Sequence, residues 1–266
     1  MKIIFSNLYM SRFKYNLDAK KLKHNIEMAK LSNFLIQSHG FETYFYGDQD
    51  SLNSFKDVNC NKFYELKDPR IKEIPEQMWS IGKLFAMLEV NEPFIHIDYD
   101  IFLFKKFDED FLKKDIIFYH NEFHLDSLVE EYQRYFELKP SNTQSFIARS
   151  YNCALFGGQN FKLIHNICNE IIDFIIENKK EINQKLNHKD SLNYMPFMPA
   201  LLLEQVWIFQ LLKHYKEEFI SYLKHTENLF VIGQEAYVKN ICHLQGSKSE
   251  DIISKNILSM NKYLSI

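Results

Sequence analysis

The sequence predicts an α/β fold built on a mixed, mostly parallel β-sheet that is flanked by helices. Three observations support this. Strand, helix and strand patterns alternate between Lys2 and Gly47, an apolar run from Phe94 to Phe104 is typical of a strand covered on both faces, and 46% of the 266 residues are hydrophobic. A chain of this composition can bury a full core as one domain or as two fused lobes.

The alternation is clearest near the start of the chain. Lys2 to Phe5 predicts a buried first strand, apolar residues recur at helical spacing from Asp18 to Gln37, and Phe41 to Tyr46 predicts a second strand. This half is therefore Rossmann-like. No GxGxxG follows the first strand, which argues against a dinucleotide cofactor.

The later elements follow the same rules of periodicity. Lys62 to Leu66 predicts a third strand, and Gln77 to Val90 predicts an amphipathic helix whose Trp79, Phe85 and Met87 we expect in the core. The remaining expectations are strands at 116–119 and near 153–156, helices at 161–178 and 199–215, a polar connection at 179–193, and a small strand, a turn and a closing helix within 229–266.

Charge and cysteine usage exclude several classes of protein. The formal net charge is -3, with 32 basic and 35 acidic residues and no long block of one sign, so we expect no nucleic-acid partner. The four cysteines lie far apart without a CxxC pair, which indicates reduced thiols rather than a zinc site or a disulfide scaffold.

The start of the chain, MKIIFSNLYMSRFK, lacks the apolar core of a signal peptide, and no run approaches the roughly 18 apolar residues of a membrane span. We therefore expect a cytoplasmic protein without a transmembrane segment. Seven glycines with abundant Lys, Asn and Ile suggest an AT-rich, bacterial genome.

Asp98 and Asp100 stand inside the apolar run, in PFIHIDYDIFLF. In a strand, residues two apart point to the same side, so both carboxylates would project together while Tyr99 faces the other way. Two such carboxylates repel each other and lose hydration unless a cation lies between them, and Mg²⁺ or Mn²⁺ fits because hard ions prefer oxygen ligands. The alternative interpretation is that DYD begins a solvated turn.

The run FIHIDYDIFLF, preceded by the helix SIGKLFAMLEV, resembles the DxD strand and preceding helix of GT-A nucleotide-sugar-dependent glycosyltransferases. Three further pieces follow in the family's order: NCALFGG at 152–158, LLEQ at 202–205 and HLQGSK at 243–248. The motif order is most similar to that of the glycogenin-like and lipopolysaccharide-galactosyltransferase-like retaining enzymes.

The resemblance implies a metal and donor site. It implies that Asp98, Asp100 and His243 hold Mn²⁺ or Mg²⁺ and that Lys248 reaches the diphosphate. It also implies that Lys83 helps to hold the donor. The full set of donor-binding candidates is Ser6, Asn7, Tyr9, Lys83, Asp98, Tyr99, Asn152, Gly157, Gly246 and Lys248.

Glu204 and Gln205 stand where the family has Asp-Gln near the reacting carbon, so the resemblance implies that they are catalytic. The chain departs from the family at three points. Glu replaces Asp at 204, the late turn reads HxxGxK with one residue fewer before its Lys, and His96 replaces an apolar residue.

Each candidate also has a structural interpretation. His243 fits a capped turn, Gly157 and Gly158 fit a turn with positive φ, and Glu204 with Gln205 fits the solvated face of a helix. We interpret His96 as a buried, hydrogen-bonded core residue.

The resemblance implies a single GT-A domain over 1–266, with a nucleotide-sugar-binding half at 1–105 and an acceptor-binding half at 106–266 that carries the late metal-ligand turn. The expected reaction moves a sugar from a nucleotide diphosphate, with UDP favoured, to a hydroxyl of a glycan, lipid-linked saccharide or peptide, with retention favoured. The alternatives are a non-catalytic nucleotide-sugar-binding module and a Mg²⁺-dependent nucleotidyltransferase, although SNLYMSRFK lacks the glycines that the latter requires.

Overall fold

The structure is a computed structural model, and it describes residues 1–8, 19–75, 78–123, 149–186, 202–215, 219–221 and 241–243. The strands are β1 (Lys2–Asn7), β2 (Thr43–Gly47), β3 (Lys62–Glu65), β4 (Phe94–Ile97), β5 (Ile101–Leu103), β6 (Ile116–Phe123), β7 (Arg149–Gly158), β8 (Phe219–Ser221) and β9 (Ile241–His243). The α-helices are α2 (Ala19–Ser38), α3 (Gln49–Phe55), α4 (Gly82–Leu88), α5 (Glu109–Leu112), α7 (Phe161–Glu177), α8 (Lys179–Leu186) and α10 (Trp207–His214). The 3-10 helices are η1 (Lys56–Val58), η2 (Pro69–Glu73) and η3 (Trp79–Ile81), and η5 (Leu202–Val206) is a π-helix.

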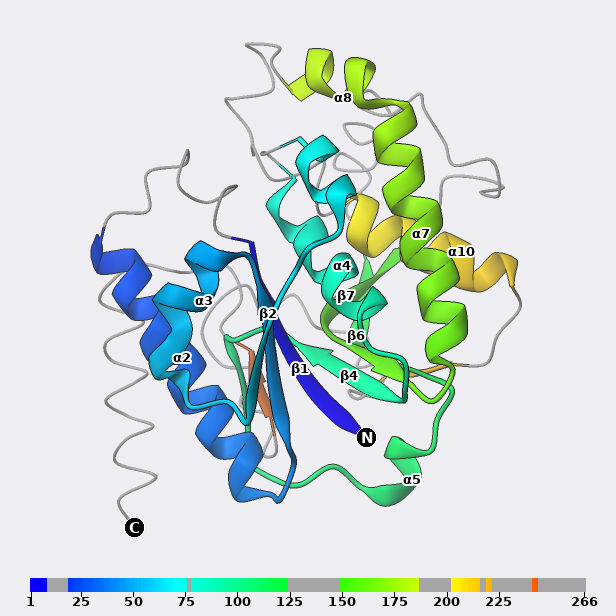
Figure 1. The fold of residues 1–266 in the computed structure, drawn as a ribbon. Helices are drawn as coiled ribbons and strands as arrows, with labels where there is room; N and C mark the ends of the chain where they lie inside the picture. Colours follow the sequence, from blue (N-terminus) through cyan, green and yellow to red (C-terminus); the bar gives the residue numbers. More distant parts are fainter. Residues whose placement is uncertain are drawn as a thin grey trace.

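A seven-stranded sheet forms the centre of the described fold, in the order β3-β2-β1-β4-β7-β6-β8 (Figure 1). Strands β1 to β4 pair in parallel, β7 is antiparallel to both β4 and β6, and β8 is parallel to β6. The sheet is therefore mixed and mostly parallel, with helices on both faces, which confirms the predicted fold class. Strands β5 and β9 form a separate two-stranded sheet.

The two faces of the sheet bury separate hydrophobic clusters. Alternate residues of β1 divide between them, with Ile4 packing beside residues of α4, α7 and α10, and Ile3 and Phe5 packing beside residues of α2 and β5. Figure 1 shows this arrangement, with α2 and α3 on one side of the sheet and α4, α7 and α10 on the other. Strand burial on both faces explains why β1, β2 and β4 read as continuous apolar runs.

Helix α4 is buried on all sides because it lies between the sheet and α7. Every residue from Gly82 to Met87 is buried. At the carboxyl end of this helix, His165 of α7 lies with Nε2 3.0 Å from the carbonyl oxygen of Met87 and 3.1 Å from that of Val90. A side chain from α7 thus satisfies carbonyl groups that a helix end leaves without intrahelical partners, and it holds α4 against the sheet.

Side-chain caps begin α3, a helix that the apolar spacing does not predict, and α7, which that spacing predicts at 161–178. The Asp48 carboxylate accepts from the backbone N–H of Ser51 at the start of α3, and the Asn160 side chain accepts from that of Leu163 at the start of α7. Helix α7 then buries one apolar stripe, which consists of Leu163, Ile164, Ile167, Cys168, Ile171, Ile172 and Ile175.

Three predicted segments differ from the observed elements. The apolar run 94–104 is two strands rather than one central strand, because a turn interrupts it. The expected polar connection at 179–193 begins with α8, whose Ile182 is buried, and its end lies outside the described residues. The helix expected at 199–215 begins, in its described part, as η5 before continuing as α10.

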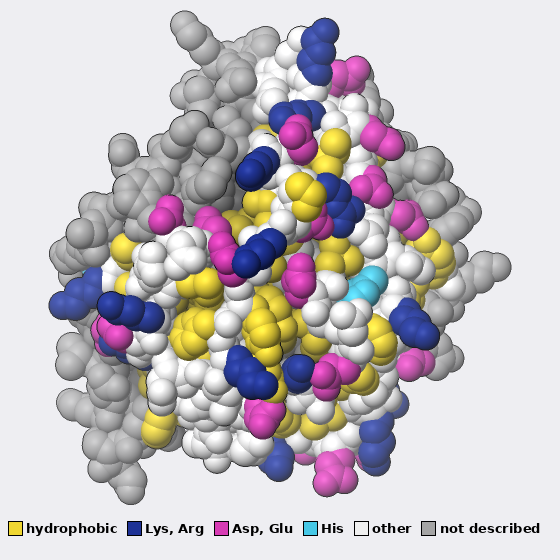
Figure 2. Space-filling view, in the orientation of Figure 1, with side chains coloured by type: hydrophobic (Ala, Val, Ile, Leu, Met, Phe, Trp, Pro, Cys, Tyr) yellow, Lys and Arg dark blue, Asp and Glu magenta, His cyan; other side chains and the backbone are white. Residues whose placement is uncertain are grey.

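The described surface carries charges of both signs, as the nearly equal numbers of acidic and basic residues predict (Figure 2). On the described part of the face in Figure 2, acidic and basic side chains are interspersed. Cys60, Cys153 and Cys168 are buried, and within the described part of the chain none of them forms a disulfide bond. Among the described helices, none has both the length and the apolar character needed to cross a membrane.

Candidate functional site

Polar and charged side chains gather at the carboxyl ends of β1 and β4. In the strand order β3-β2-β1-β4, the chain moves outward in one direction from β1 to β3 and then returns to the other side of β1 with β4. Open α/β sheets bind ligands outside the carboxyl ends of their strands at such a switch point. Ser6 and Asn7 end β1, and Asp98 directly follows β4, so these predicted residues lie at this position.

The two aspartates of DYD flank a turn. The Asp98 backbone N–H donates to the carbonyl of Ala154 at 2.7 Å and so completes the pairing with β7, whereas the Ile101 N–H donates back to the Asp98 carbonyl at 3.0 Å. This i to i+3 bond is typical of a β-turn. The turn carries the chain from the central sheet to β5, which packs with α2. The expectation that Asp98 and Asp100 project to the same side as residues of one strand is therefore wrong.

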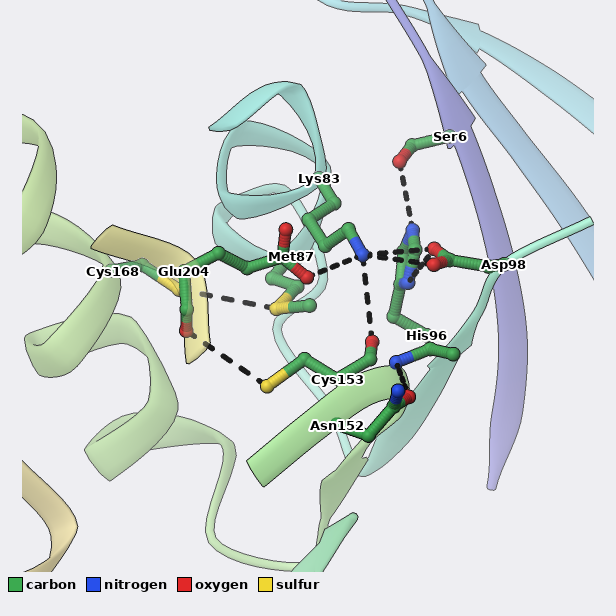
Figure 3. A network of polar contacts seen from close by, with 10 residues as sticks. Ser6, Lys83, Met87, His96, Asp98, Asn152, Cys153, Cys168 and Glu204 are labelled. Carbon is green, nitrogen blue, oxygen red and sulfur yellow. Dashed lines mark hydrogen bonds and ion pairs between the residues drawn. The ribbon is translucent and has the colours of Figure 1, made fainter. Parts of the chain in front are cut away.

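A buried lysine joins the DYD turn to the LLEQ segment. Lys83 Nζ lies 2.9 Å from Asp98 Oδ1 and 2.6 Å from Glu204 Oε1, and it is 3.5 Å from the carbonyl oxygen of Cys153 (Figure 3). The side chain of Lys83 is 8% exposed, compared with 2% for Glu204 and 32% for Asp98. Three segments that the sequence separates widely therefore meet at one ammonium group.

Burial and pairing act in opposite directions on these groups. Burial lowers the pKa of Lys83, and the negative charges of Asp98 and Glu204 raise it by more than burial lowers it. The pKa of Lys83 is therefore above its usual value, and the side chain stays protonated. Burial raises the pKa of Glu204, and Asp98 adds to this against the attraction of Lys83. One ammonium does not fully compensate two carboxylates, so this corner of the molecule favours additional positive charge.

His96 is buried beside this cluster. Its Nε2 lies 2.8 Å from Ser6 Oγ and its Nδ1 lies 3.8 Å from Asp98 Oδ1. The residue is 1% exposed, and burial followed by the charge of Lys83 lowers the pKa of His96 to about 3, although Asp98 opposes the shift. His96 is therefore neutral near pH 7. The structure confirms that it is a buried, hydrogen-bonded residue, as its sequence context predicted.

Three other predicted residues are buried near these groups through their strands and helices. Asn7 is 8% exposed and its Nδ2 donates to Ser51 Oγ at 3.3 Å, while Asn152 is 1% exposed and its Oδ1 accepts from the Ala154 N–H at 3.0 Å. Gln205, which follows Glu204 in η5, is 9% exposed. The interpretation of Glu204 and Gln205 as the solvated face of a helix is therefore wrong.

Tyr99 and Asp100 lie within the turn. Tyr99 packs into the cluster on the α2 face of the sheet, with its ring 6.0 Å from that of Phe55, so it points away from the Lys83 side. Asp100 is 8% exposed. The carboxylate of Asp100 is thus buried at the point where the chain crosses from one face of the sheet to the other.

The strand pairing brings the far end of the chain to this turn. In the antiparallel pair β5 and β9, the backbone of His243 is in register with that of Ile101, which directly follows Asp100. Figure 1 draws β9 beside the central sheet. The backbone of His243, the predicted third metal ligand, therefore lies close to Asp100, although more than half of the chain separates the two residues in sequence.

Gly157 lies away from the cluster. It pairs with Ile95, and a Cβ at this position would lie 2.1 Å from the Phe94 carbonyl oxygen. Gly158 has φ +143, and its Cβ would lie 2.0 Å from the Asp115 carbonyl oxygen. Close backbone approach accounts for both glycines without a ligand. Both glycines lie in β7 rather than in the expected turn, and of the two only Gly158 has the predicted positive φ.

Three predicted donor residues, Tyr9, Gly246 and Lys248, lie outside the described residues. Sequence reasoning named the members of the charged cluster but missed two of its connections. It did not anticipate that Ser6 and His96 contact each other or that Lys83 contacts Glu204. The signal for the second was present, since a lysine and a glutamate on otherwise apolar helices need partners once they are buried.

The donor set of this corner is compatible with a hard divalent ion. Asp98 and Glu204 bring two carboxylates to the single ammonium of Lys83, and the buried Asp100 follows Asp98 by two residues. Among the side chains that the structure describes, no three His, Cys, Asp or Glu residues come together as a complete metal site. Mg²⁺ typically takes one or two carboxylates and completes its shell with phosphate oxygens and water, so Asp98 and Asp100 fit that mode of binding.

The fold and this corner together define an α/β protein with a lysine-bridged cluster of acidic side chains at the switch point of its sheet. By sequence, the chain belongs to a family of unknown function (DUF6734), which it matches over residues 16–261. No curated protein matches it.

Two solved structures are similar to the chain in outline. One is the galactosyltransferase LgtC in complex with donor and acceptor sugar analogues, at 8% identity over 98% of this chain and 94% of that chain, with a TM-score of 0.48. The other is an active-site mutant of LgtC, at 12% identity over 70% of each chain, with a TM-score of 0.40. Both likenesses are loose, so neither assigns a chemistry to this chain.

Proposed function

We propose that this protein is a metal-dependent glycosyltransferase of the GT-A type that uses a nucleotide-diphosphate sugar, with a UDP-sugar favoured. The observation that carries the proposal is the ion cluster in which Lys83 bridges Asp98 and Glu204 at the carboxyl ends of β1 and β4. The cluster unites three separately predicted motifs at the position where open α/β sheets bind nucleotides.

In this proposal, Asp98, Asp100 and His243 hold Mn²⁺ or Mg²⁺, and Lys248 and Lys83 add positive charge on the donor. The register of β9 with β5 supports the role of His243, since it brings that residue's backbone beside Ile101. The ion, when bound, neutralises charge on the leaving nucleoside diphosphate. The protein's own lysines contribute in the same direction, and their effect increases as the glycosidic bond breaks.

Glu204 and Gln205 are the proposed catalytic residues. A buried carboxylate stabilises positive charge that develops on a sugar ring more strongly than a solvated one, because fewer water molecules screen it. The bond from Lys83 at 2.6 Å fixes the orientation of Glu204. We favour retention, in which the leaving phosphate accepts the proton of the acceptor hydroxyl. The acceptor is a hydroxyl of a glycan, a lipid-linked saccharide or a peptide.

One observation favours a second candidate, a non-catalytic nucleotide-sugar-binding module. Glu204 is only 2% exposed and already accepts a short bond from a buried lysine, an arrangement that also serves a purely structural ion pair. Turnover therefore distinguishes the candidates more directly than binding does.

A thermal-shift screen of UDP-, GDP- and CMP-sugars, each with and without Mn²⁺, tests the proposal. We expect Mn²⁺-dependent stabilisation by a UDP-sugar, because a ligand that binds only the native state raises the free energy of unfolding. Release of UDP from the best donor is then measured with and without hydroxyl acceptors. Failure of every sugar to stabilise the protein would sink the transferase proposal, and stabilisation without any release of UDP would favour the module.

The variant Asp100→Asn tests the metal assignment directly. It should weaken Mn²⁺-dependent UDP binding by at least the roughly 10- to 100-fold that changes around metal ligands cost, with the fold intact. Asp110→Asn is the matched control because the Asp110 side chain is 92% exposed on α5. Isothermal titration of UDP into each variant with Mn²⁺ measures the effect, and an Asp100→Asn affinity equal to that of the wild type would refute the assignment.

A further inference from the structure

Ser6, His96 and Asp98 form a row across the junction of β1 and β4. The imidazole of His96 lies between the other two, with Nε2 2.8 Å from Ser6 Oγ and Nδ1 3.8 Å from Asp98 Oδ1 (Figure 3). The ring is buried, and within the described part of the chain its Nδ1 has no hydrogen-bond partner. A buried polar atom of this kind needs an explanation.

The position of Asp98 decides which nitrogen of the ring carries the proton. A neutral imidazole has one N–H and one bare nitrogen. If Nδ1 were bare, its lone pair would face the Asp98 carboxylate oxygen at 3.8 Å. The lone pair and the carboxylate would then repel each other in a site where water screens charge poorly. If Nδ1 carries the proton, the N–H dipole points toward Asp98. The distance is too long for a hydrogen bond, but the electrostatic attraction still favours the second tautomer.

This tautomer determines what the Ser6 hydroxyl does. With Nδ1 protonated, Nε2 is bare and accepts the proton of Ser6 Oγ–H at 2.8 Å. A serine hydroxyl has a single donor, so the contact with His96 uses it, and only the oxygen lone pairs remain for another group. Ser6 is only partly buried and lies at the carboxyl end of β1, on the ligand side of the switch point.

We propose that His96 is a positioning residue that holds Ser6 as a hydrogen-bond acceptor, and that Ser6 selects ligands which present an N–H or O–H group at the end of β1. The inference rests on the proposed function, because the ligand is then the nucleoside part of the donor. That part offers two donors of this class, the imide N–H of a uracil-type base and the hydroxyls of the ribose. Cytosine presents an acceptor where uracil has its imide N–H.

The tautomer is measured on the wild-type protein without any ligand. In ¹⁵N-edited NMR spectra of the histidine side chains, the His96 resonances are identified by their loss in His96→Gln. We expect the Nδ1–H tautomer. Detection of the Nε2–H tautomer would overturn the proposal, because Ser6 would then receive a proton from His96 and would be free to donate its own.

The selectivity is measured by titrating UDP, CDP, 2′-deoxy-UDP and 3′-deoxy-UDP with Mn²⁺ into the wild type and Ser6→Ala. In the wild type we expect the ligand that lacks the matching donor to bind up to about tenfold more weakly, which is the value of one net hydrogen bond. In Ser6→Ala this ratio should fall to about one. If Ser6→Ala abolishes the difference in affinity between UDP and CDP, the base donates to Ser6. If it abolishes the difference between UDP and a deoxy analogue, the ribose donates to Ser6. No change in any ratio would contradict the proposal.

Two variants of His96 separate positioning from packing. The Gln side chain of His96→Gln offers an amide oxygen near the former Nε2, so it should keep Ser6 as an acceptor and retain the selectivity. His96→Leu fills a similar volume without any acceptor, so the selectivity should fall toward that of Ser6→Ala. Equal selectivity in the two variants would show that His96 only fills space.

These measurements also separate this inference from the proposed function. If the wild type binds no nucleotide with any metal, the proposed function and the ligand selectivity fail together. If UDP binds but the tautomer or the ratios are wrong, only the role of Ser6 and His96 fails.

Discussion

The two ends of the β4–β7 strand pair use the same backbone ladder for different purposes. At the amino end of β4, Phe94 and Ile95 pair with Gly158 and Gly157, and the strands approach so closely that a Cβ at Gly157 would lie 2.1 Å from a carbonyl oxygen. At the carboxyl end, the ladder finishes at Asp98, whose carboxylate meets a buried lysine.

The difference between the two ends shows how one strand pair can be tightly packed at one end and charged at the other. The glycine end is buried and needs only the absence of side chains. The charged end holds three ionised or ionisable groups in a buried place, an arrangement that is weak evidence for stability and stronger evidence for function. We therefore expect substitutions at the two ends to fail for different physical reasons.

The largest expected effect on stability is that of Lys83→Met. It removes the ammonium and leaves Asp98 and the buried Glu204 without their shared partner, so the free energy of unfolding should fall by about 3–5 kcal/mol. Urea denaturation followed by circular dichroism measures the change. Lys113→Met is the control, since the Lys113 side chain is 69% exposed and pairs with Asp110, three residues earlier.

Adding Glu204→Gln to Lys83→Met should recover part of the lost stability, because it removes one of the two uncompensated charges. If Lys83→Met unfolds at the same urea concentration as the Lys113→Met control, the cluster is not a coupled ion network.

Gly157→Ala should cost somewhat less, near the roughly 3 kcal/mol at the upper end of typical overpacking, because the clashing atom belongs to the backbone of β4 and has little room to move. The same denaturation experiment measures it. Gly40→Ala is the matched control, since Gly40 has φ +83 but open space around its Cβ position, and it should lose only about 1–2 kcal/mol from backbone strain. Equal losses would mean that the close approach at Gly157 costs no more than the backbone strain at Gly40, and would contradict the role given to close packing at the glycine end.

A smaller effect is expected at a partly exposed ion cluster outside both ends. Arg70 pairs with Asp68 at 2.8 Å and with Asp173 at 3.2 Å, and its NH1 donates to Asn169, so it ties η2 to α7. Because solvent screens these groups, Arg70→Met should lower the free energy of unfolding by about 1 kcal/mol or less.

The pH dependence of this pair has a defined sign. Hydrogen bonding from Arg70 lowers the pKa of Asp68, although burial opposes it. The stabilisation of the folded state by the Arg70–Asp68 pair is therefore complete above the unfolded-state pKa of an aspartate, about 4. It is lost as the pH falls through the lower pKa that Asp68 has in the folded state. Thermal unfolding of wild type and Arg70→Met should converge in acid. A difference that persists below that range would point to packing of the Arg70 stem instead.

Much of the fold could be predicted because its signals are local. The spacing of apolar residues identified β1, α2, β2, β3 and α7 within a few residues of their observed bounds. The break after Ile97 could not be predicted in this way. Apolar residues continue from 101 to 103 because they enter the cluster on the α2 face, and a sequence pattern does not distinguish one strand from two strands joined by a turn.

The sequence by itself determined which residue types are available for chemistry, namely an aspartate pair in an apolar run, a lysine on the preceding helix and a glutamate far along the chain. Only the tertiary structure decided that Lys83 joins Asp98 to Glu204, that His96 contacts Ser6, and that Gly157 lies at the other end of β4 from Asp98. Helix and strand patterns depend on neighbours a few residues away, whereas these contacts depend on strand order and register, which place residues 90 and 121 positions apart within hydrogen-bond distance.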